Sequence, residues 1–276
     1  MLFRSLIVVK GAGDLATGIA CRLFRAGCSV VMTETAQPTT VRCTVAFSQA
    51  VYRGTAEVEG ITAVLVQSPQ EALDCVRAGK VAVLVDPEGT CVPALKPDGV
   101  VDAILAKKNL GTALADAPAV VGVGPGFTPG VDCHAAVETQ RGHDLGRVLW
   151  DRSPAPNTGI PGDIGGYTTE RLLRAPAEGS FVPRAAIGDT VQAGQTVGRV
   201  GDAPMKAQIT GVVRGLLPEG TPVFAGMKAG DVDPRCRREH CFSVSDKARA
   251  VGGGVLEALM CQWSKGGEIQ WHRTSN

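Results

Sequence analysis

The sequence predicts an α/β protein in which a mostly parallel β-sheet is followed by a small all-β unit and a C-terminal helix. Three observations lead to this fold class. A strand, a glycine turn, a helix and a second strand follow one another near the start of the chain. Further apolar runs of strand length recur as far as Val123. Beyond them, a glycine-rich segment repeats itself with a period of 32 residues.

The first of these patterns is typical of a Rossmann-like domain. Leu6–Val9 forms an apolar, β-branched run, and the apolar positions of Leu15–Arg25 recur at helical spacing. Ser29–Thr33 forms a second strand of the same kind. Because a glycine turn joins the first strand to the helix, the order matches the phosphate-binding unit of dinucleotide-binding folds.

Four residues of this unit are candidate ligand-binding residues. Gly11 permits a tight turn, and Gly13 with Asp14 lies where the backbone approaches a phosphate at the helix N-terminus. Glu34, at the end of the second strand, would accept hydrogen bonds from ribose hydroxyls. The alternative is a strand-to-helix turn that needs glycine only for its shape. Gly18, inside the helix, indicates close packing against another element.

Later strands of the predicted sheet also end at polar or glycine residues. The runs are Ile61–Val66, Lys80–Val85, Val100–Ala106 and Ala119–Val123. Asp86 follows the second of these runs, Lys107 and Asn109 the third, and Gly124 and Gly126 the fourth. Because ligands of open α/β sheets bind outside the carboxyl ends of the strands, we expect these residues to frame one shared pocket. The alternative is that these loops are polar only because loops are solvated.

The chain divides into four predicted segments. Residues 1–151 form the ligand-binding domain, and residues 152–167 form a Pro/Gly-rich linker or functional loop. Residues 168–234 contain the two 32-residue half-repeats, and residues 235–276 form a helical segment that packs back. Glycines 252 to 254 within this last helix need a reason such as tight contact with another backbone.

The half-repeats resemble the biotinyl/lipoyl barrel-sandwich domain, whose halves carry a GDxVxxGQ motif like that of IGDTVQAGQTV. The resemblance raises the question of a prosthetic group on Lys206. In the carriers several residues separate the modified lysine from the second half, whereas here Lys206 directly precedes Ala207, where the second half begins. We therefore expect no biotin or lipoate at Lys206.

The segment from Gly124 to Arg147 holds the densest group of reactive side chains. Asp132, His134 and His143 are the candidate catalytic residues, and Arg141 is a candidate phosphate ligand. The spacing fits no strong metal template, so no metal site is assigned, although two histidines and a carboxylate could bind a divalent ion. A third interpretation is that these charged groups only satisfy one another in a packed turn.

Composition excludes several classes of partner. Lysine and arginine total 28 against 27 acidic residues, and aromatic residues make up 4%, so neither a basic footprint nor stacking platforms for nucleic acid are present. No apolar run reaches membrane-spanning length. Nine cysteines without framework spacing indicate a reduced, cytoplasmic chain.

The motifs KGAGDLATGIACRL, GVGPGFTPGVDCHAAVETQRGHDLGRV, PNTGIPG, KAGDVDPR and SDKARAVGGGVLEAL together resemble the YqeB family. That family comprises accessory proteins of selenium-dependent molybdenum hydroxylases. The resemblance implies a role in the maturation of a hydroxylase of the xanthine dehydrogenase type, with the apo-hydroxylase as partner.

Three hypotheses about function follow. The first is a maturation factor that binds a small anionic ligand, either the molybdenum cofactor or a nucleotide. The second is an NAD(P)-dependent oxidoreductase with His134 or His143 as acid/base. The third is a scaffold that binds no small molecule. Assembly into a homo-oligomer is left open.

Overall fold

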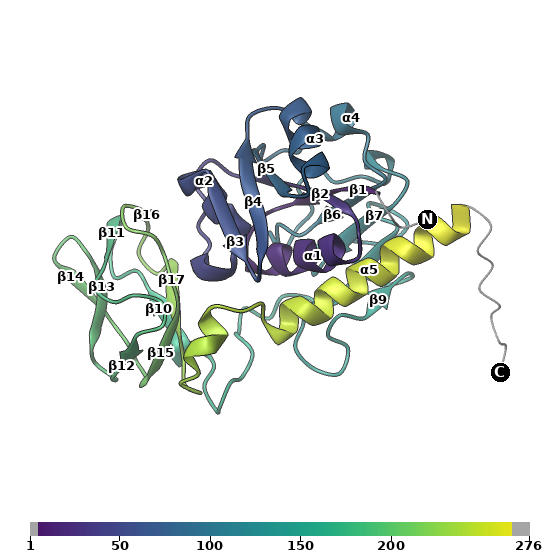
Figure 1. Ribbon diagram of the computed structural model, residues 1–276. Coiled ribbons are helices and arrows are strands. Elements are labelled where there is room, and N and C mark those ends of the chain that lie inside the picture. Colours follow the sequence, from purple (N-terminus) through teal and green to yellow (C-terminus); the bar gives the residue numbers. More distant parts are fainter. Residues whose placement is uncertain (1–4, 267–276) are drawn as a thin grey trace.

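The computed structural model describes residues 5–266, which form one nine-stranded sheet and two four-stranded sheets (Figure 1). The order across the large sheet is β3-β4-β5-β2-β1-β6-β7-β8-β9. Its inner strands pair in parallel, whereas the edge strands β3 and β9 run antiparallel to their neighbours, so the sheet is mixed. The bounds are β1 (Leu6–Lys10), β2 (Ser29–Glu34), β3 (Thr55–Val58), β4 (Ile61–Val66), β5 (Val81–Val85), β6 (Gly99–Asp102), β7 (Val120–Val123), β8 (Ala135–Val137) and β9 (Val148–Leu149).

Helices cover both faces of this sheet. α1 (Asp14–Arg25) and α5 (Asp246–Gly266) pack on one face, and α3 (Pro69–Arg77) and α4 (Val92–Leu95) pack on the other (Figure 1). The short α2 (Ala50–Arg53) lies beside β3. Because side chains alternate along a strand, Ile7 and Val9 enter the first core and Val8 enters the second. Burial on both faces explains the non-alternating apolar runs of the sequence.

The predicted fold class, a Rossmann-like sheet followed by a biotinyl/lipoyl-like barrel-sandwich, is wrong. In a Rossmann sheet the third strand lies next to the second. Here the chain leaves β2 for the hairpin β3–β4 at the edge and returns through α3, which places β5 between β4 and β2. In the described chain from β6 to β8 no α-helix forms, and α5 covers that part of the sheet instead. Apolar runs reveal that strands are buried but do not encode their order.

The all-β part consists of two antiparallel sheets, with strand orders β10-β17-β15-β12 and β14-β13-β11-β16. Each sheet combines strands of both half-repeats, and β10 and β14, which end 32 residues apart in sequence, form an edge strand of one sheet each. Lys206 ends β14 and pairs with Thr196. The bounds are β10 (Leu172–Arg174), β11 (Gly179–Pro183), β12 (Thr190–Val191), β13 (Thr196–Val200), β14 (Ala203–Lys206), β15 (Gly211–Leu216), β16 (Pro222–Val223) and β17 (Lys228–Asp233).

Close glycine contacts hold α5 on α1. A Cβ atom on Gly18 would lie 2.5 Å from the Cβ of Ala248, and one on Gly252 would lie 3.2 Å from the Cβ of Arg22. Gly18 of α1 faces Ala248 of α5, and Arg22, further along α1, faces Gly252, further along α5. The two helices therefore run in the same direction. Both helices therefore begin at the same edge of the sheet.

The glycines of α5 differ in what surrounds them. A Cβ on Gly254 would overlap the carbonyl oxygen of Gly146, whereas one on Gly253 would meet nothing within 4 Å. Close backbone contact therefore accounts for Gly252 and Gly254 but not for Gly253. Within residues 5–266, no helix is long and apolar enough to cross a membrane.

We expect Gly18→Ala to lower the free energy of unfolding by about 1–3 kcal/mol, because its methyl group forces α1 and α5 apart. This loss exceeds the ~1 kcal/mol that alanine gains over glycine inside a helix. Gly253→Ala is the matched control and should stabilise the protein by about 0.5–1 kcal/mol. Urea denaturation of both variants tests the contact, and equal stability of the two would contradict it.

Candidate functional site

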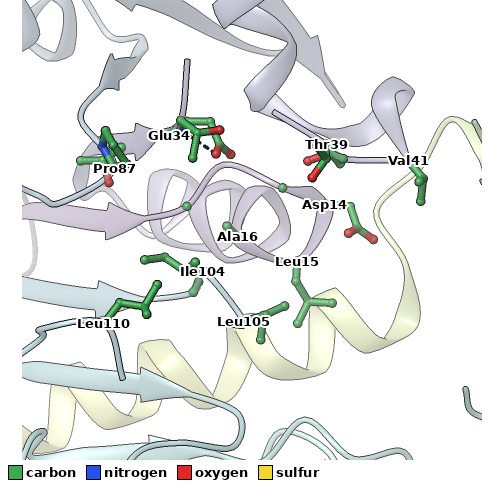
Figure 2. A pocket seen from close by; sticks show the side chains of 16 residues that line it. Asp14, Leu15, Ala16, Glu34, Thr39, Val41, Pro87, Ile104, Leu105 and Leu110 are labelled. Atoms are coloured by element: carbon green, nitrogen blue, oxygen red, sulfur yellow. Dashed lines mark hydrogen bonds between the residues drawn. The ribbon is translucent and has the colours of Figure 1, made fainter. Parts of the chain in front are cut away.

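A cavity of about 390 Å³ opens at the carboxyl ends of the inner strands of the large sheet. Its walls come from the turn after β1, the first turn of α1, the end of β2 with the loop that follows, and the segment after β6. Figure 2 shows Glu34 and Thr39 on one side of the start of α1 and the apolar side chains of Ile104, Leu105 and Leu110 on the other. The cavity therefore offers one polar wall and one apolar wall.

The two predicted glycines of this cavity have different roles. Gly11 has a φ of +94°, and a Cβ there would lie 3.0 Å from the carbonyl oxygen of Ala103, so the fold requires a glycine. Gly13 has a φ of −65°, and a Cβ there would lie 3.4 Å from Thr40 Oγ1, an ordinary contact. The backbone therefore does not require glycine at position 13. Its missing side chain leaves the N-terminus of α1 open to the cavity.

Glu34 holds the glycine turn in place. Its carboxylate accepts hydrogen bonds from the backbone N–H of Ala12 at 3.0 Å and from that of Thr35 at 2.8 Å. Glu34 also lines the cavity, and each carboxylate oxygen retains a lone pair. Glu34, which was predicted as a ribose acceptor, thus lines the cavity, but some of its acceptor sites are occupied by backbone N–H groups of the turn and of Thr35.

Asp14 lies in the first turn of α1, and its negative charge is balanced by Arg42. Arg42 Nη1 donates to Asp14 Oδ2 at 3.1 Å, and Arg42 Nη2 donates to the carbonyl oxygens of His240 and Ser243. The Arg42 side chain is only 8% exposed. Sequence reasoning missed this residue, because the segment that covers it comes from the distant C-terminal part of the chain.

Lys107 and Asn109 lie beside the first cavity rather than in its wall. The amide nitrogen of Asn109 donates to the carbonyl oxygen of Thr112 at 2.7 Å, and its oxygen accepts from the N–H of Gly111 and of Thr112. Asn109 therefore shapes its own turn. Lys107 Nζ lies 3.3 Å from the oxygen of Asn157 when that amide is turned to accept from it.

A second cavity of about 290 Å³ lies at the carboxyl ends of β7 and β8. Its wall includes Pro125, Gln140, Arg141, Lys247 and residues 155–158 and 160–162 of the Pro/Gly-rich segment. The predicted phosphate-binding glycines contribute through packing. A Cβ on Gly124 would lie 2.8 Å from Thr139 Oγ1, and one on Gly126 would lie 2.6 Å from the Cα of Lys108. Both glycines bring neighbouring segments together beneath this cavity.

Arg141 enters the second cavity already paired. Its guanidinium donates two hydrogen bonds to the carboxylate of Asp246, at 2.8 Å and 2.9 Å. These hydrogen bonds from Arg141 hold the pKa of Asp246 well below its usual range, while partial burial opposes them. The pair fastens the turn after β8 to the first residue of α5.

The predicted catalytic residues do not meet at either cavity. Asp132 and His134 precede β8, and the backbone N–H of Val120 donates to His134 Nδ1 at 3.0 Å. Because β7 and β8 are parallel, this contact lies at their amino ends, opposite the edge that carries Gly13. His143 is exposed in the turn between β8 and β9. Asp132 and His134 thus lie at the opposite edge from the glycine turn, and His143 lines neither cavity.

Burial disfavours the reactive thiolate form of Cys91, Cys133 and Cys241. Burial raises the pKa of Cys133 to about 12 and that of Cys91 to about 12, and it also raises the pKa of Cys241 despite nearby Arg214 and Arg42. Across residues 5–266, no group of three or more His, Cys, Asp or Glu side chains is placed to hold a metal ion. The first N–H groups of α1 and α5 lie at the carboxyl edge of the sheet, where they can attract an anion.

The fold and the site thus define an α/β protein with two cavities at the carboxyl edge of its sheet. Comparison with known proteins identifies a related sequence. The chain is 51% identical over 261 residues to a protein of Escherichia coli K12 described as uncharacterized protein YqeB. The match covers 95% of this chain and 48% of that protein, so the chain spans about half the length of the curated relative. This identity supports the resemblance to the YqeB family that the sequence motifs indicate. No protein-family model matches the chain.

Solved structures give only weak likenesses. An aspartoacylase family protein of Mesorhizobium loti is 12% identical, with a TM-score of 0.28, over 85% of this chain and 87% of that one. A succinylglutamate desuccinylase/aspartoacylase of Rhodobacter sphaeroides is 14% identical, with a TM-score of 0.25, over 83% and 84%. Likenesses this weak support no inference about the chemistry of this chain.

Glu138 joins the turn after β8 to the Pro/Gly-rich segment at the second cavity, and its substitution tests whether these hydrogen bonds hold that segment. The side chain is buried, and its carboxylate accepts from the backbone N–H of Thr139 and Gln140, both at 2.7 Å, and of Ala155 at 2.8 Å. We expect Glu138→Ala to lower the free energy of unfolding by about 2–5 kcal/mol, because it leaves buried N–H groups unpaired.

Hydrogen exchange provides the local measurement for this variant. The amide of Ala155 should exchange faster in Glu138→Ala than in the wild type, since the Pro/Gly-rich segment loses its anchor. Glu138→Gln keeps one acceptor oxygen and should lie between the two. Unchanged protection of Ala155 in the alanine variant would show that Glu138 does not hold this segment.

Proposed function

We propose that this protein binds a phosphate-bearing small molecule at the glycine-turn cavity and acts in the cytoplasm as an accessory protein for maturation of a selenium-dependent molybdenum hydroxylase. The ligand part rests on one observation, the N-terminus of α1 left open by Gly13. The first N–H groups of a helix have no partner within it, and the helix dipole is positive there, so both attract a phosphate. Arg42 offsets the opposing charge of Asp14.

The two walls of the cavity indicate the shape of the ligand. The polar wall with Glu34 and Thr39 suits hydroxyl groups, and the apolar wall with Ile104, Leu105 and Leu110 suits a flat ring. A volume of about 390 Å³ lies near the lower end of the ~300–1,000 Å³ usual for small-molecule sites. This size favours a ligand as large as a mononucleotide or the molybdenum cofactor over a complete dinucleotide.

The maturation role comes from the family that the sequence resembles and from the relative that supports this family. A protein that loads a hydroxylase must hold a phosphate-bearing cofactor and pass it to the apo-enzyme. A cavity at an open sheet edge, flanked by the exposed side chain of Leu110, is compatible with such a transfer. The apo-hydroxylase is thus the proposed partner.

A second candidate function is that of an NAD(P)-dependent oxidoreductase. It is favoured by Glu34, which lies beside the glycine turn as a ribose acceptor would. The histidines that would act as acid/base in that reaction lie away from the cavity, His134 at the opposite strand ends and His143 in an exposed turn. We therefore place this candidate second.

Equilibrium dialysis against the molybdenum cofactor and, separately, NAD tests the proposal. We expect the cofactor to bind the wild type, and Gly13→Val to weaken binding by at least about tenfold, because the new side chain blocks the approach to α1. Gly253→Ala serves as the matched control and should bind like the wild type, since nothing lies near that position.

The same samples separate the alternatives. Tight binding of NAD together with turnover of NAD(P)H would favour the oxidoreductase. Failure of both ligands to bind, with an apo-hydroxylase still retained by Gly13→Val in a pull-down, would favour a scaffold. Either result would overturn the ligand part of the proposal.

A further inference from the structure

Lys247 is a half-buried cation in the first turn of α5, and it lines the second cavity. Within residues 5–266, no carboxylate forms an ion pair with Lys247, and no side-chain hydrogen bond engages its ammonium group. Burial, followed by the positive charge of Arg141, lowers the pKa of Lys247, while Asp14, Glu138 and Asp246 act in the opposite direction. An ammonium group is thus held at the cavity without a fixed counter-ion.

The acidic residues near Lys247 are all engaged elsewhere. Asp246 accepts two hydrogen bonds from Arg141. Glu138 accepts three from backbone N–H groups, and Asp14 is paired with Arg42. Each of them already accepts at least one hydrogen bond from another group, and none forms an ion pair with Lys247 in the part of the chain that the structure describes. Because Lys247 is half-buried and lines the cavity, an anion bound there can pair with its ammonium group.

The remaining wall of the cavity indicates what kind of anion fits. Pro125 and Ile160 supply apolar surface, and Gln140 and Asn157 supply amide groups that orient a polar ligand. A volume of about 290 Å³ has room for a compact organic body in addition to the anionic group. Backbone segments from four parts of the chain build this wall, so the cavity is more than the end of one helix.

We infer that the second cavity is a binding site for a small organic anion, with a phosphate or carboxylate group held by Lys247 and an apolar body against Pro125 and Ile160. Lys247 binds as a point charge, and Arg141 adds positive potential while it stays paired with Asp246. The inference is independent of the proposed function, because it requires nothing to bind at the glycine turn.

Titration calorimetry with phenyl phosphate and with benzoate tests this site and distinguishes the two anionic groups. At least one probe should bind the wild type, and Lys247→Met should bind it at least about tenfold more weakly, because the charge-assisted contact is lost. Lys228→Met, which removes an exposed lysine from β17, should leave the affinity unchanged. Failure of both probes to bind, or unchanged affinity in Lys247→Met, would overturn the inference.

A second test uses only the wild-type protein, so its result does not depend on whether a variant folds. The rate of lysine acetylation is measured by mass spectrometry with and without the bound probe. The bound probe should slow acetylation of Lys247 but not that of Lys228, and equal rates with and without the probe would overturn the inference. The Gly13→Val variant shows which of the two cavities the probe occupies. If that variant weakens probe binding and Lys247→Met does not, the probe occupies the glycine-turn cavity and the inference fails.

Discussion

The contact between α1 and α5 is the constraint on which the rest of the structure depends. Gly18 and Gly252 bring the two helices so close that a Cβ atom at either position would lie within 3.2 Å of a side-chain carbon of the other helix. Because the helices run in the same direction, both N-termini face the carboxyl edge of the sheet. The positive ends of two helix dipoles therefore act on one region, and Lys247 arrives there from the far end of the chain.

This arrangement explains how positive potential gathers at one edge of a chain whose formal net charge is +1. Two of the arginines near the edge are used within the protein, since Arg42 offsets Asp14 and Arg141 is paired with Asp246. What remains for ligands are helix N–H groups and the ammonium of Lys247. Such groups suit small anions.

Local pattern allowed part of this arrangement to be predicted from the sequence. The first strand, the glycine turn and the first helix follow from apolar spacing and turn chemistry, which depend on neighbours in the chain. The role of Gly11 in the turn was predicted in this way, whereas Glu34 was predicted only as a ribose acceptor and its hydrogen bond to Ala12 was not. Strand order does not follow from local pattern, because β4 and β5 both have the pattern of buried strands and nothing local tells which of them lies next to β2. The fold class was wrong for this reason.

The site residues that were missed depend on contacts between distant segments. Arg42 is buried only because the segment around His240 covers it, and Lys247 reaches the edge only because of the helix contact. Conversely, Asp132 and His134 were grouped with the glycine turn because they follow a strand end in sequence. The chain after Gly124 runs back to the opposite end of the sheet before β8 begins, and sequence proximity could not reveal this return.

The most direct measurement of the central claim is a crystal of this protein soaked in selenate, with the anion located by its anomalous scattering. The account predicts anomalous peaks at the carboxyl edge, next to the N-terminus of α1 and next to Lys247. Peaks confined to other surfaces, such as the strand ends that carry His134, would contradict the claim that this edge is the anion-binding part of the molecule.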